Sequence, residues 1–249
     1  MSIAADTPVL EARGLTKRFH GLQAVGGVSF SLRKGEIFGL IGPNGAGKTT
    51  LVNLISGSLF ADEGELLFEG RPIEREPPQR RAHLGIGRTF QVMKPFPRLS
   101  VIENVTVGAL FGFEGGERSL RLARERARDV LDFTGLLHRM DQHADQLGGP
   151  DRKRLELAKA LVMRPKLLLL DEVMAGLTHA EIDEVVAIIK KIRDSGITIL
   201  VIEHVMRAIR SLSDRILVLH HGEQIAEGKP DAVLADARVV EAYLGKRRA

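Results

Sequence analysis

The segment that decides the fold reads Gly42-Pro43-Asn44-Gly45-Ala46-Gly47-Lys48-Thr49-Thr50. It follows the apolar run Ile37–Ile41, which predicts a buried strand, and it has the spacing of a P-loop. Its glycines permit a loop conformation in which successive backbone N–H groups point inward at phosphate oxygens. A helix that begins near Lys48 adds its positive end. The segment therefore predicts an anion site between a strand and a helix.

Two side chains of this segment supply what the backbone cannot. Lys48 provides a point charge for the outer phosphates of a nucleotide, and the Thr49 hydroxyl provides a ligand for Mg²⁺. The alternative is a glycine turn without a ligand. The strand before the segment and the helix after it favour nucleotide binding over that alternative.

A second segment ends an apolar strand in two acids. It reads Leu167-Leu168-Leu169-Leu170-Asp171-Glu172. The carboxyl edge of a parallel sheet is where open α/β folds place their ligands. Asp171 would hold Mg²⁺ directly or through water, and Glu172 would polarise the water that attacks the γ-phosphate. Taken alone, the acidic pair could equally cap a helix.

A third strand end carries a histidine, in Ile202-Glu203-His204. A neutral imidazole there can hydrogen-bond the γ-phosphate or the attacking water. A purely structural role is the alternative. The remaining histidines have no spacing typical of a metal site.

Composition excludes several classes of protein. The 249 residues include no cysteine, 44% are hydrophobic and 27% are charged, which excludes thiol chemistry and bulk disorder. The net charge of +4 is modest, and one Tyr and no Trp leave few stacking surfaces, which disfavours nucleic-acid binding. No apolar run reaches the roughly 18 to 20 residues of a membrane-spanning helix. With no secretory pattern at Met1–Pro8, we expect a cytoplasmic chain.

Strand and helix patterns divide the chain into an α/β core and a helical insertion. Strands are predicted at Val9–Arg13, Val28–Leu32, Glu36–Ile41, Glu65–Glu69, Leu84–Phe90, Lys166–Asp171, Ile197–Glu203, Arg215–His220 and Gln224–Glu227. From about Val101 to Arg164 the pattern is helical, with Leu120, Ala123, Ala127, Val130 and Leu131 on one face. We expect a single domain, with a nucleotide-binding core at 1–95 and 165–249 and a helical subdomain at 96–164.

Taken together, these motifs resemble the ATP-binding subunit of ABC transporters over essentially the whole chain. The resemblance also rests on Gln91 in Thr89-Phe90-Gln91 and on a signature-like segment at Leu147–Ala158. It implies an α/β P-loop NTPase core with an N-terminal antiparallel β-subdomain and an inserted α-helical subdomain. It further implies ATP hydrolysis with Mg²⁺, in a homodimer or heterodimer that sandwiches two ATP molecules.

The resemblance assigns roles to individual residues. Residues Gly42 to Thr50 would bind the nucleotide, with Phe19 stacked on adenine unless it is a core aromatic, and with Gly148 and Gly149 facing the ATP of the opposite chain. Gln91 would join Thr49 and Asp171 at the metal and couple the nucleotide to the helical subdomain. The catalytic set would be Glu172, His204, Gln91 and Lys48.

Three further segments are similar to the Liv-type subunits of branched-chain amino acid importers: Gly87-Arg88-Thr89-Phe90-Gln91, Glu103-Asn104-Val105 and Glu241-Ala242-Tyr243-Leu244-Gly245. This similarity implies import of branched-chain amino acids or of a related amide, urea or organic acid. It also implies a peripheral position on the cytoplasmic face of the inner membrane, permease partners, a second ATPase subunit and, indirectly, a periplasmic solute-binding protein. No nucleic-acid partner is expected. An export or lipid-extraction ATPase and a non-hydrolysing ATP-binding scaffold remain alternatives.

The signature departs from the family pattern Leu-Ser-Gly-Gly-Gln and reads Leu147-Gly148-Gly149-Pro150-Asp151. The serine hydroxyl is missing, and Pro150 lacks the N–H that a second glycine would offer the opposite γ-phosphate. Proline suits the first turn of a helix, so the helix itself should survive. We expect weakened closure of the dimer, tolerated where a different ATPase subunit supplies a regular signature. Val173 and Thr178 are smaller departures from the family pattern.

Overall fold

The computed structural model describes residues 7–89, 95–113 and 116–244. The chain separates into two compact units, the first formed by residues 1–78 and 198–249 and the second by residues 79–197. No helix in the described ranges is long and apolar enough to cross a membrane.

An antiparallel sheet occupies the N-terminal part of the first unit. Its strands are β1 (Leu10–Phe19), β2 (Leu22–Leu32), β4 (Glu63–Phe68) and β5 (Arg71–Pro72), in the order β2-β1-β4-β5. Leu10, Leu15, Val28 and Leu32 alternate with more exposed residues and are fully buried, as in a sheet with one face on the core. This sheet confirms the predicted antiparallel β-subdomain.

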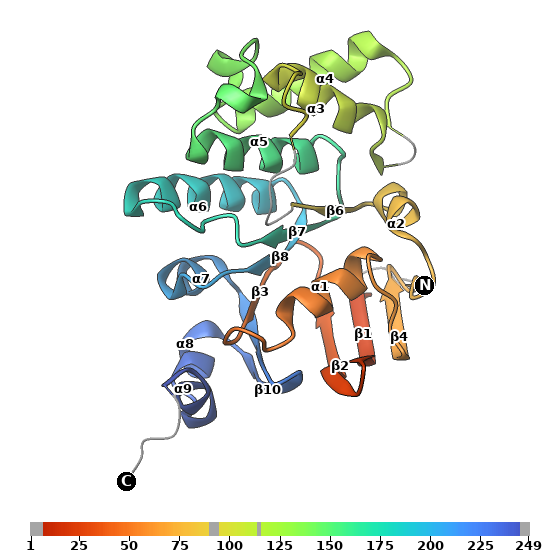
Figure 1. Ribbon diagram of the computed structural model, residues 1–249, viewed down its shortest axis with the longest axis vertical. Coiled ribbons are helices and arrows are strands. Elements are labelled where there is room, and N and C mark those ends of the chain that lie inside the picture. The colour runs from red at the N-terminus through yellow and green to blue at the C-terminus, as the bar shows by residue number, and fades with distance from the viewer. Residues whose placement is uncertain (1–6, 90–94, 114–115, 245–249) are drawn as a thin grey trace, which may run out of the picture. The chain divides into compact units, whose positions relative to one another are not determined.

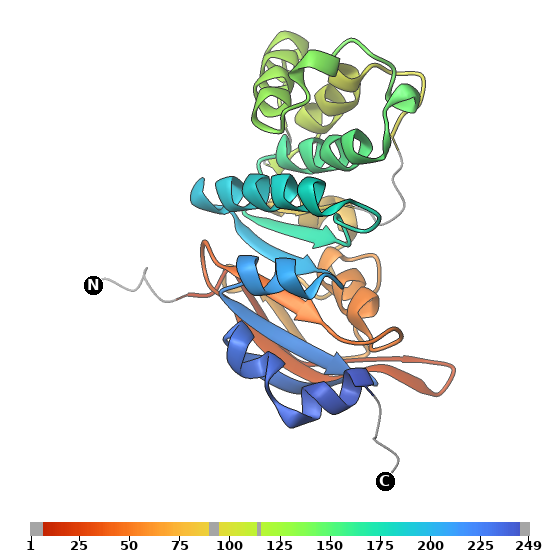
Figure 2. The same ribbon diagram turned by 90° about the vertical axis from the view of Figure 1, so that its left-hand side faces the viewer.

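The other strands of the first unit include the one that leads into the P-loop. They are β3 (Ile37–Ile41), β8 (Thr198–Ile202), β9 (Arg215–His220) and β10 (Glu223–Gly228), with β3 parallel to both β8 and β9 and β10 antiparallel to β9. All residues of β3 and β8 are buried, which explains their continuous apolar sequence. Helix α1 (Lys48–Ser56) follows β3, and α7 (Met206–Leu212) follows β8. Helices α8 (Pro230–Leu234) and α9 (Ala237–Leu244), the last blue coils in Figure 2, pack against β10.

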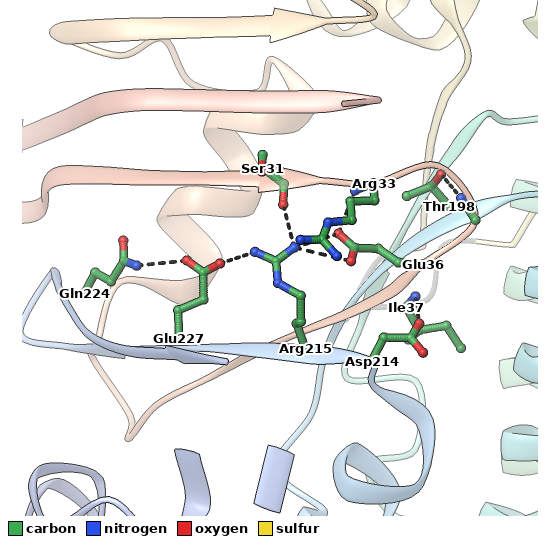
Figure 3. A network of polar contacts seen from close by, with 10 residues as sticks. Ser31, Arg33, Glu36, Ile37, Thr198, Asp214, Arg215, Gln224 and Glu227 are labelled. Carbon is green, nitrogen blue, oxygen red and sulfur yellow. Dashed lines mark hydrogen bonds and ion pairs between the residues drawn. The ribbon is translucent and has the colours of Figure 1, made fainter. Parts of the chain in front are cut away.

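A polar network joins these strands at the start of β3 (Figure 3). The guanidinium of Arg215 donates to the Ser31 carbonyl at 3.2 Å and to the Glu36 carboxylate at 3.2 and 3.3 Å, and it also pairs with Glu227. The Asp214 carboxylate accepts the backbone N–H of Ile37 at 2.8 Å. Since these residues come from β2, β9, β10 and the entry to β3, the network fixes the strand that leads into the P-loop.

The second unit consists mostly of helices with a short parallel strand pair. Strand β6 (Ile86–Arg88) pairs with β7 (Leu167–Asp171), and the helices are α2 (Pro78–Leu84), α3 (Val101–Leu110), α4 (Leu120–Phe133), α5 (Gly149–Leu161) and α6 (His179–Asp194). Short 3₁₀ turns lie at Leu137–Arg139 and Ala144–Gln146. Helices α3, α4 and α5, drawn in yellow to green in Figure 1, share one apolar core that includes Val105, Ala127, Leu131 and Leu155. The predicted boundaries of the helical subdomain, 96–164, stay a prediction.

Two local predictions in this unit were wrong. The strand expected at Leu84–Phe90 is confined to Ile86–Arg88, because Leu84 ends α2 and Gly85 turns the chain with a φ of +108°. Phe90 lies outside the described residues. Leu120, expected on the apolar face of α4, is 66% exposed, because it is the first residue of the helix, next to the N-cap Ser119.

Candidate active site

The P-loop connects the end of β3 to the start of α1 through a backbone that only glycine adopts easily. Gly42, Gly45 and Gly47 have φ values of +153°, +77° and +102°. A Cβ added to Gly42 would lie 2.2 Å from the Leu219 carbonyl oxygen, and one added to Gly47 would lie 2.3 Å from the Ala24 carbonyl oxygen. Both conformation and space therefore require glycine at positions 42 and 47.

The loop itself holds its lysine. The Lys48 side chain is 6% exposed, and its Nζ donates to the carbonyl oxygens of Gly42 at 2.6 Å and Pro43 at 2.9 Å. Asn44 and Gly45 of the loop and Thr49 in the first turn of α1 are exposed, whereas Ala46 is buried and Thr50 is half-buried. These two backbone carbonyls thus hold the ammonium group against the loop.

Two neighbours of the P-loop escaped sequence reasoning. In the β9–β10 turn, Gly222 donates its N–H to the Ala46 carbonyl at 3.0 Å and accepts the N–H of Gly26 at 2.9 Å. Burial raises the pKa of the Tyr243 phenol on α9, and a hydrogen bond from the Gly42 backbone acts in the opposite direction. The turn at His221 and Gly222 was predicted, but nothing local in the sequence indicates that it contacts the loop.

Substitution of Gly222 by Ala tests whether this turn supports the P-loop. Position 222 has a φ of +81°, and the new Cβ would meet the Ala24 carbonyl oxygen at 2.9 Å. The left-handed conformation alone costs a non-glycine residue about 1 to 2 kcal/mol. We expect a lower Tm and a rise of a few fold in the Kd for ATP, measured by thermal unfolding and nucleotide titration.

The matched control is Gly196→Ala, because Gly196 has a φ of +95° and its added Cβ meets nothing within 4 Å. This control should lower the Tm and leave the Kd for ATP unchanged. Equal nucleotide affinity in the two variants would show that the turn does not support the loop.

The other predicted residues of the first unit lie at strand ends. His204 follows β8 and is exposed, while the preceding Glu203 is 1% exposed. Phe19 ends β1 and is 39% exposed, with the Lys17 ammonium 5.6 Å from the centroid of its ring. The alternative of Phe19 as a core aromatic is therefore wrong.

Asp171 is the last residue of β7 and is buried, with 3% of the residue exposed. Its Oδ2 forms an ion pair with Nη2 of Arg88 at 2.9 Å, and its backbone N–H donates to the Thr89 hydroxyl at 3.1 Å. Thr89 in turn donates its N–H to the Leu169 carbonyl at 2.9 Å. Arg88 and Thr89 thus fix both the side chain and the backbone of the acid, a role that sequence reasoning missed.

Glu172 follows directly and lies in a left-handed conformation with a φ of +50°. Its carbonyl oxygen accepts a hydrogen bond from Nζ of Lys153 at 3.1 Å. The next helix, α6, begins only at His179 with Thr178 as its N-cap, so the alternative that the acidic pair caps a helix is wrong.

The altered signature forms the start of α5. Gly148 is the N-cap with a φ of −66°, Gly149 is the first helical residue, and Pro150 occupies the first turn as expected. A Cβ added to either glycine would meet nothing within 4 Å. Arg152 donates to the carbonyl oxygens of Leu147 and Asp145, each at 2.7 Å, and so holds the turn that presents the two exposed glycines.

Similarity to known proteins decides the family. Residues 25–175 match the ABC transporter family, and residues 223–249 match the family of branched-chain amino acid ATP-binding cassette transporters. The probable branched-chain amino acid transport ATP-binding protein LivG of Archaeoglobus fulgidus is 37% identical over 95% of this chain and 95% of its own length. This chain is an ATP-binding cassette of the ABC transporter family.

Other relatives of the cassette agree. The high-affinity branched-chain amino acid transport ATP-binding protein LivG of Escherichia coli K12 is 38% identical over 96% of the cassette and 98% of its own length. BraF of Pseudomonas aeruginosa, which carries the same description, is 36% identical over 96% of the cassette and 98% of its own length. The predicted resemblance to this family is confirmed.

Solved structures confirm the fold of the cassette. A nucleotide-free ATP-binding cassette from an ABC transporter has a TM-score of 0.88 and 33% identity, with 96% of this chain and 100% of that one covered. The ADP conformation of the cassette MJ1267 has a TM-score of 0.87 and 34% identity, with 97% of this chain and 100% of that one covered. A dimeric post-hydrolysis state of the cassette MJ0796 bound to ADP and Pi has a TM-score of 0.80 and 26% identity, with 89% and 98% covered. The cassette is therefore a nucleotide-binding ATPase.

The predicted site residues fall into two groups by position. Residues 42–50, Phe19 and His204 belong to the first unit of the cassette, and Gly148, Gly149, Asp171 and Glu172 belong to the second. Gln91 lies outside the described residues.

Proposed function

We propose that this cassette hydrolyses ATP to drive import of branched-chain amino acids, or of a related amide, urea or organic acid, through an ABC transporter. The observation that carries the proposal is the similarity to LivG and BraF over at least 95% of the chain, joined by the match of residues 223–249 to the branched-chain amino acid family. The sequence contains the groups that the proposed hydrolysis uses, namely the P-loop, both acids and His204.

ATP binding falls to the P-loop. Backbone N–H groups of the segment from Gly42 to Thr50 would donate to the phosphates, and the Lys48 ammonium, held at the Gly42 and Pro43 carbonyls, would neutralise part of their charge. The exposed ring of Phe19 is free of the core and accessible to stack on adenine. The cost of binding is reduced because the β9–β10 turn already holds the loop in the conformation that its glycines permit.

The side chains assigned to the metal have the chemistry that a magnesium ion prefers. Mg²⁺ prefers hard oxygen ligands, and this chain offers the exposed Thr49 hydroxyl and the Asp171 carboxylate, with the Gln91 amide oxygen as a third. Asp171 is oriented for such a role by Arg88 and Thr89. When bound, the ion neutralises charge on the β- and γ-phosphates.

Glu172 performs the acid–base work of hydrolysis. Its carboxylate accepts a hydrogen bond from a water molecule and so directs the water oxygen at the γ-phosphorus. As the new P–O bond forms, the Glu172 carboxylate takes a proton from the water, the bond between the γ-phosphorus and the β–γ bridging oxygen breaks, and ADP and inorganic phosphate leave. His204 donates a hydrogen bond to a γ-phosphate oxygen, and Lys48 holds the charge that develops on the phosphates.

Coupling to transport requires partners. Two ATPase subunits sandwich two ATP molecules, each P-loop facing Gly148 and Gly149 of the opposite chain, and Gln91 passes closure to permease subunits in the membrane. The cassette is then peripheral on the cytoplasmic face of the inner membrane, and a periplasmic binding protein delivers the solute to the permeases. We propose a heterodimer, because a second subunit with a regular signature would compensate for Pro150.

Reconstitution tests this function. The cassette, its permeases and the second ATPase subunit are incorporated into vesicles. The periplasmic binding protein is added, and ATP hydrolysis and uptake of labelled leucine are both measured. ATP-dependent uptake supports import, and movement of a solute or lipid in the opposite direction would establish export instead. The altered signature gives a specific reason to consider a non-hydrolysing scaffold, and tight ATP binding without hydrolysis in the complete assembly would establish that function.

Substitution of Lys48 by Ala removes the phosphate-binding ammonium. Loss of a charge-assisted hydrogen bond is worth about 1.5 kcal/mol or more, so we expect the Kd for ATP to rise about tenfold or more. Nucleotide titration measures the change, with Lys34→Ala as the control because Lys34 is an exposed lysine in the turn before β3. Unchanged affinity in Lys48→Ala would contradict the role of this lysine.

A further inference from the structure

A lysine of the signature helix contacts the backbone of the proposed catalytic glutamate. Lys153 lies in the second turn of α5, and its Nζ donates to the Glu172 carbonyl oxygen at 3.1 Å. Both residues are partly buried and both belong to the second unit. The contact spans 19 residues of sequence, so it is a tertiary link between two segments that the proposed function uses separately.

The acceptor carbonyl belongs to Glu172, a residue with a strained backbone conformation. Glu172 has a φ of +50°, a left-handed conformation that non-glycine residues adopt only when their surroundings hold them there. On its N-terminal side the backbone is fixed by β7, and on its C-terminal side Val173 and Met174 are 5% and 1% exposed. A hydrogen bond from a charged ammonium to the intervening carbonyl is stronger than one between neutral groups. The Ala175 N–H also donates to this carbonyl, at 3.3 Å, and Lys153 adds the charged donor that helps to hold the peptide group that follows the Cα of Glu172.

The donor, Lys153, lies on α5, the helix whose N-terminus is the signature. Gly148 and Gly149 begin α5, and Pro150 lies in its first turn, one turn before Lys153. Arg152, the neighbouring residue, is tied to the Leu147 carbonyl oxygen at 2.7 Å. Because helix backbones are stiff over a few turns, a shift of this N-terminus is carried to the Lys153 ammonium.

We propose that Lys153 is a positioning residue that couples the signature of this cassette to its own catalytic glutamate. When Gly148 and Gly149 engage the nucleotide of the opposite chain, α5 shifts and the hydrogen bond to the Glu172 carbonyl sets the orientation of the carboxylate. Hydrolysis at one ATP thereby responds to occupancy of the other. This inference rests on the proposed function, since it needs both a closed dimer and a hydrolysing Glu172.

The test compares Lys153→Met and Lys153→Arg in the assembled transporter. Met retains the length of the side chain and cannot donate, whereas Arg retains a charged donor. We expect Lys153→Met to lower kcat about tenfold, to leave the Kd for ATP within about twofold of the wild type, and to reduce the cooperativity of hydrolysis with respect to ATP. Lys153→Arg should recover most of kcat and cooperativity. Lys191→Met is the matched control, because Lys191 is an exposed lysine in the last turn of α6.

The outcomes separate the inference from the function beneath it. A wild-type kcat and cooperativity in Lys153→Met would overturn the inference, and so would a parallel loss of ATP affinity and Tm that Arg does not rescue, since that would show a merely structural lysine. In both of these cases the wild type hydrolyses ATP and the proposed function stands. Absence of hydrolysis in the wild-type assembly would instead overturn the proposed function, and the inference with it.

Discussion

Replacement of Glu172 by Gln is expected to lower ATP turnover about a hundredfold to a thousandfold while ATP binding is retained. The amide has nearly the shape of the carboxylate but cannot accept a proton, so the variant loses the group that directs the attacking water. Removal of one preorganised electrostatic group typically costs about 2.7 to 4 kcal/mol of barrier. The backbone should not move, because β7, the buried Val173 and the Lys153 contact hold it independently of the side chain.

Steady-state hydrolysis in the complete assembly and equilibrium binding of ATP measure the two quantities. Glu125→Gln is the matched control, since Glu125 is a surface residue of α4 whose ion pair with Arg121 is solvent-exposed and worth little. Turnover above half of the wild-type value in Glu172→Gln would remove Glu172 from the catalytic role. Loss of ATP binding in the same variant would show that the residue acts on affinity instead.

Restoration of the signature is expected to act in the opposite direction. Gly148→Ser combined with Pro150→Gly should raise the turnover of the purified homodimer about tenfold to a hundredfold, because it returns a hydroxyl and a backbone N–H that face the opposite γ-phosphate. The structure accommodates the serine, since Gly148 has a φ of −66° and an added Cβ meets nothing within 4 Å. The helix should persist without the proline, because its core contacts at Leu155 and Ala158 are unchanged.

Gly148→Ala with Pro150→Gly is the control, because it supplies the Cβ and the N–H without the hydroxyl. Turnover is measured for the homodimer and for the pair with a second ATPase subunit that carries a regular signature. A gain in the homodimer and little gain in the pair would agree with compensation by the second subunit. No gain in the homodimer would show that the departures from the family pattern do not limit closure of the dimer. Strong hydrolysis by the unaltered homodimer, equal to that of the pair, would contradict the proposal that the second subunit compensates for the altered signature.

Sequence alone predicted the elements whose information is local. The glycine spacing of the P-loop, the continuous apolar runs of β3, β7 and β8 and the turn at Gly222 all follow from short-range rules, and each lies within one or two residues of its expected position. The prediction that a strand begins at Leu84 was wrong because Leu84 forms the last residue of α2. Only Gly85, with its positive φ, marks the boundary between that helix and the strand.

The parts that sequence could not predict are contacts between distant segments. The ion pair from Arg88 to Asp171 spans 83 residues, and no local pattern marks the last residue of a short strand as the partner of an acid so far away. The same holds for the Lys153 contact and for Tyr243 beside Gly42, where the residue type allows many partners. Positions of the chemical groups were therefore predictable, whereas the residues that orient them were not.

The ion pair of Arg88 and Asp171 bears on the order in which ligands arrive. A buried carboxylate already compensated by a half-buried guanidinium presents little net negative charge to a free divalent cation. On the proposed assignment of Asp171, the protein by itself would compete poorly for Mg²⁺ in solution. A divalent cation would then be taken up together with the triphosphate, so that occupancy of the site would follow the concentration of the metal–nucleotide complex.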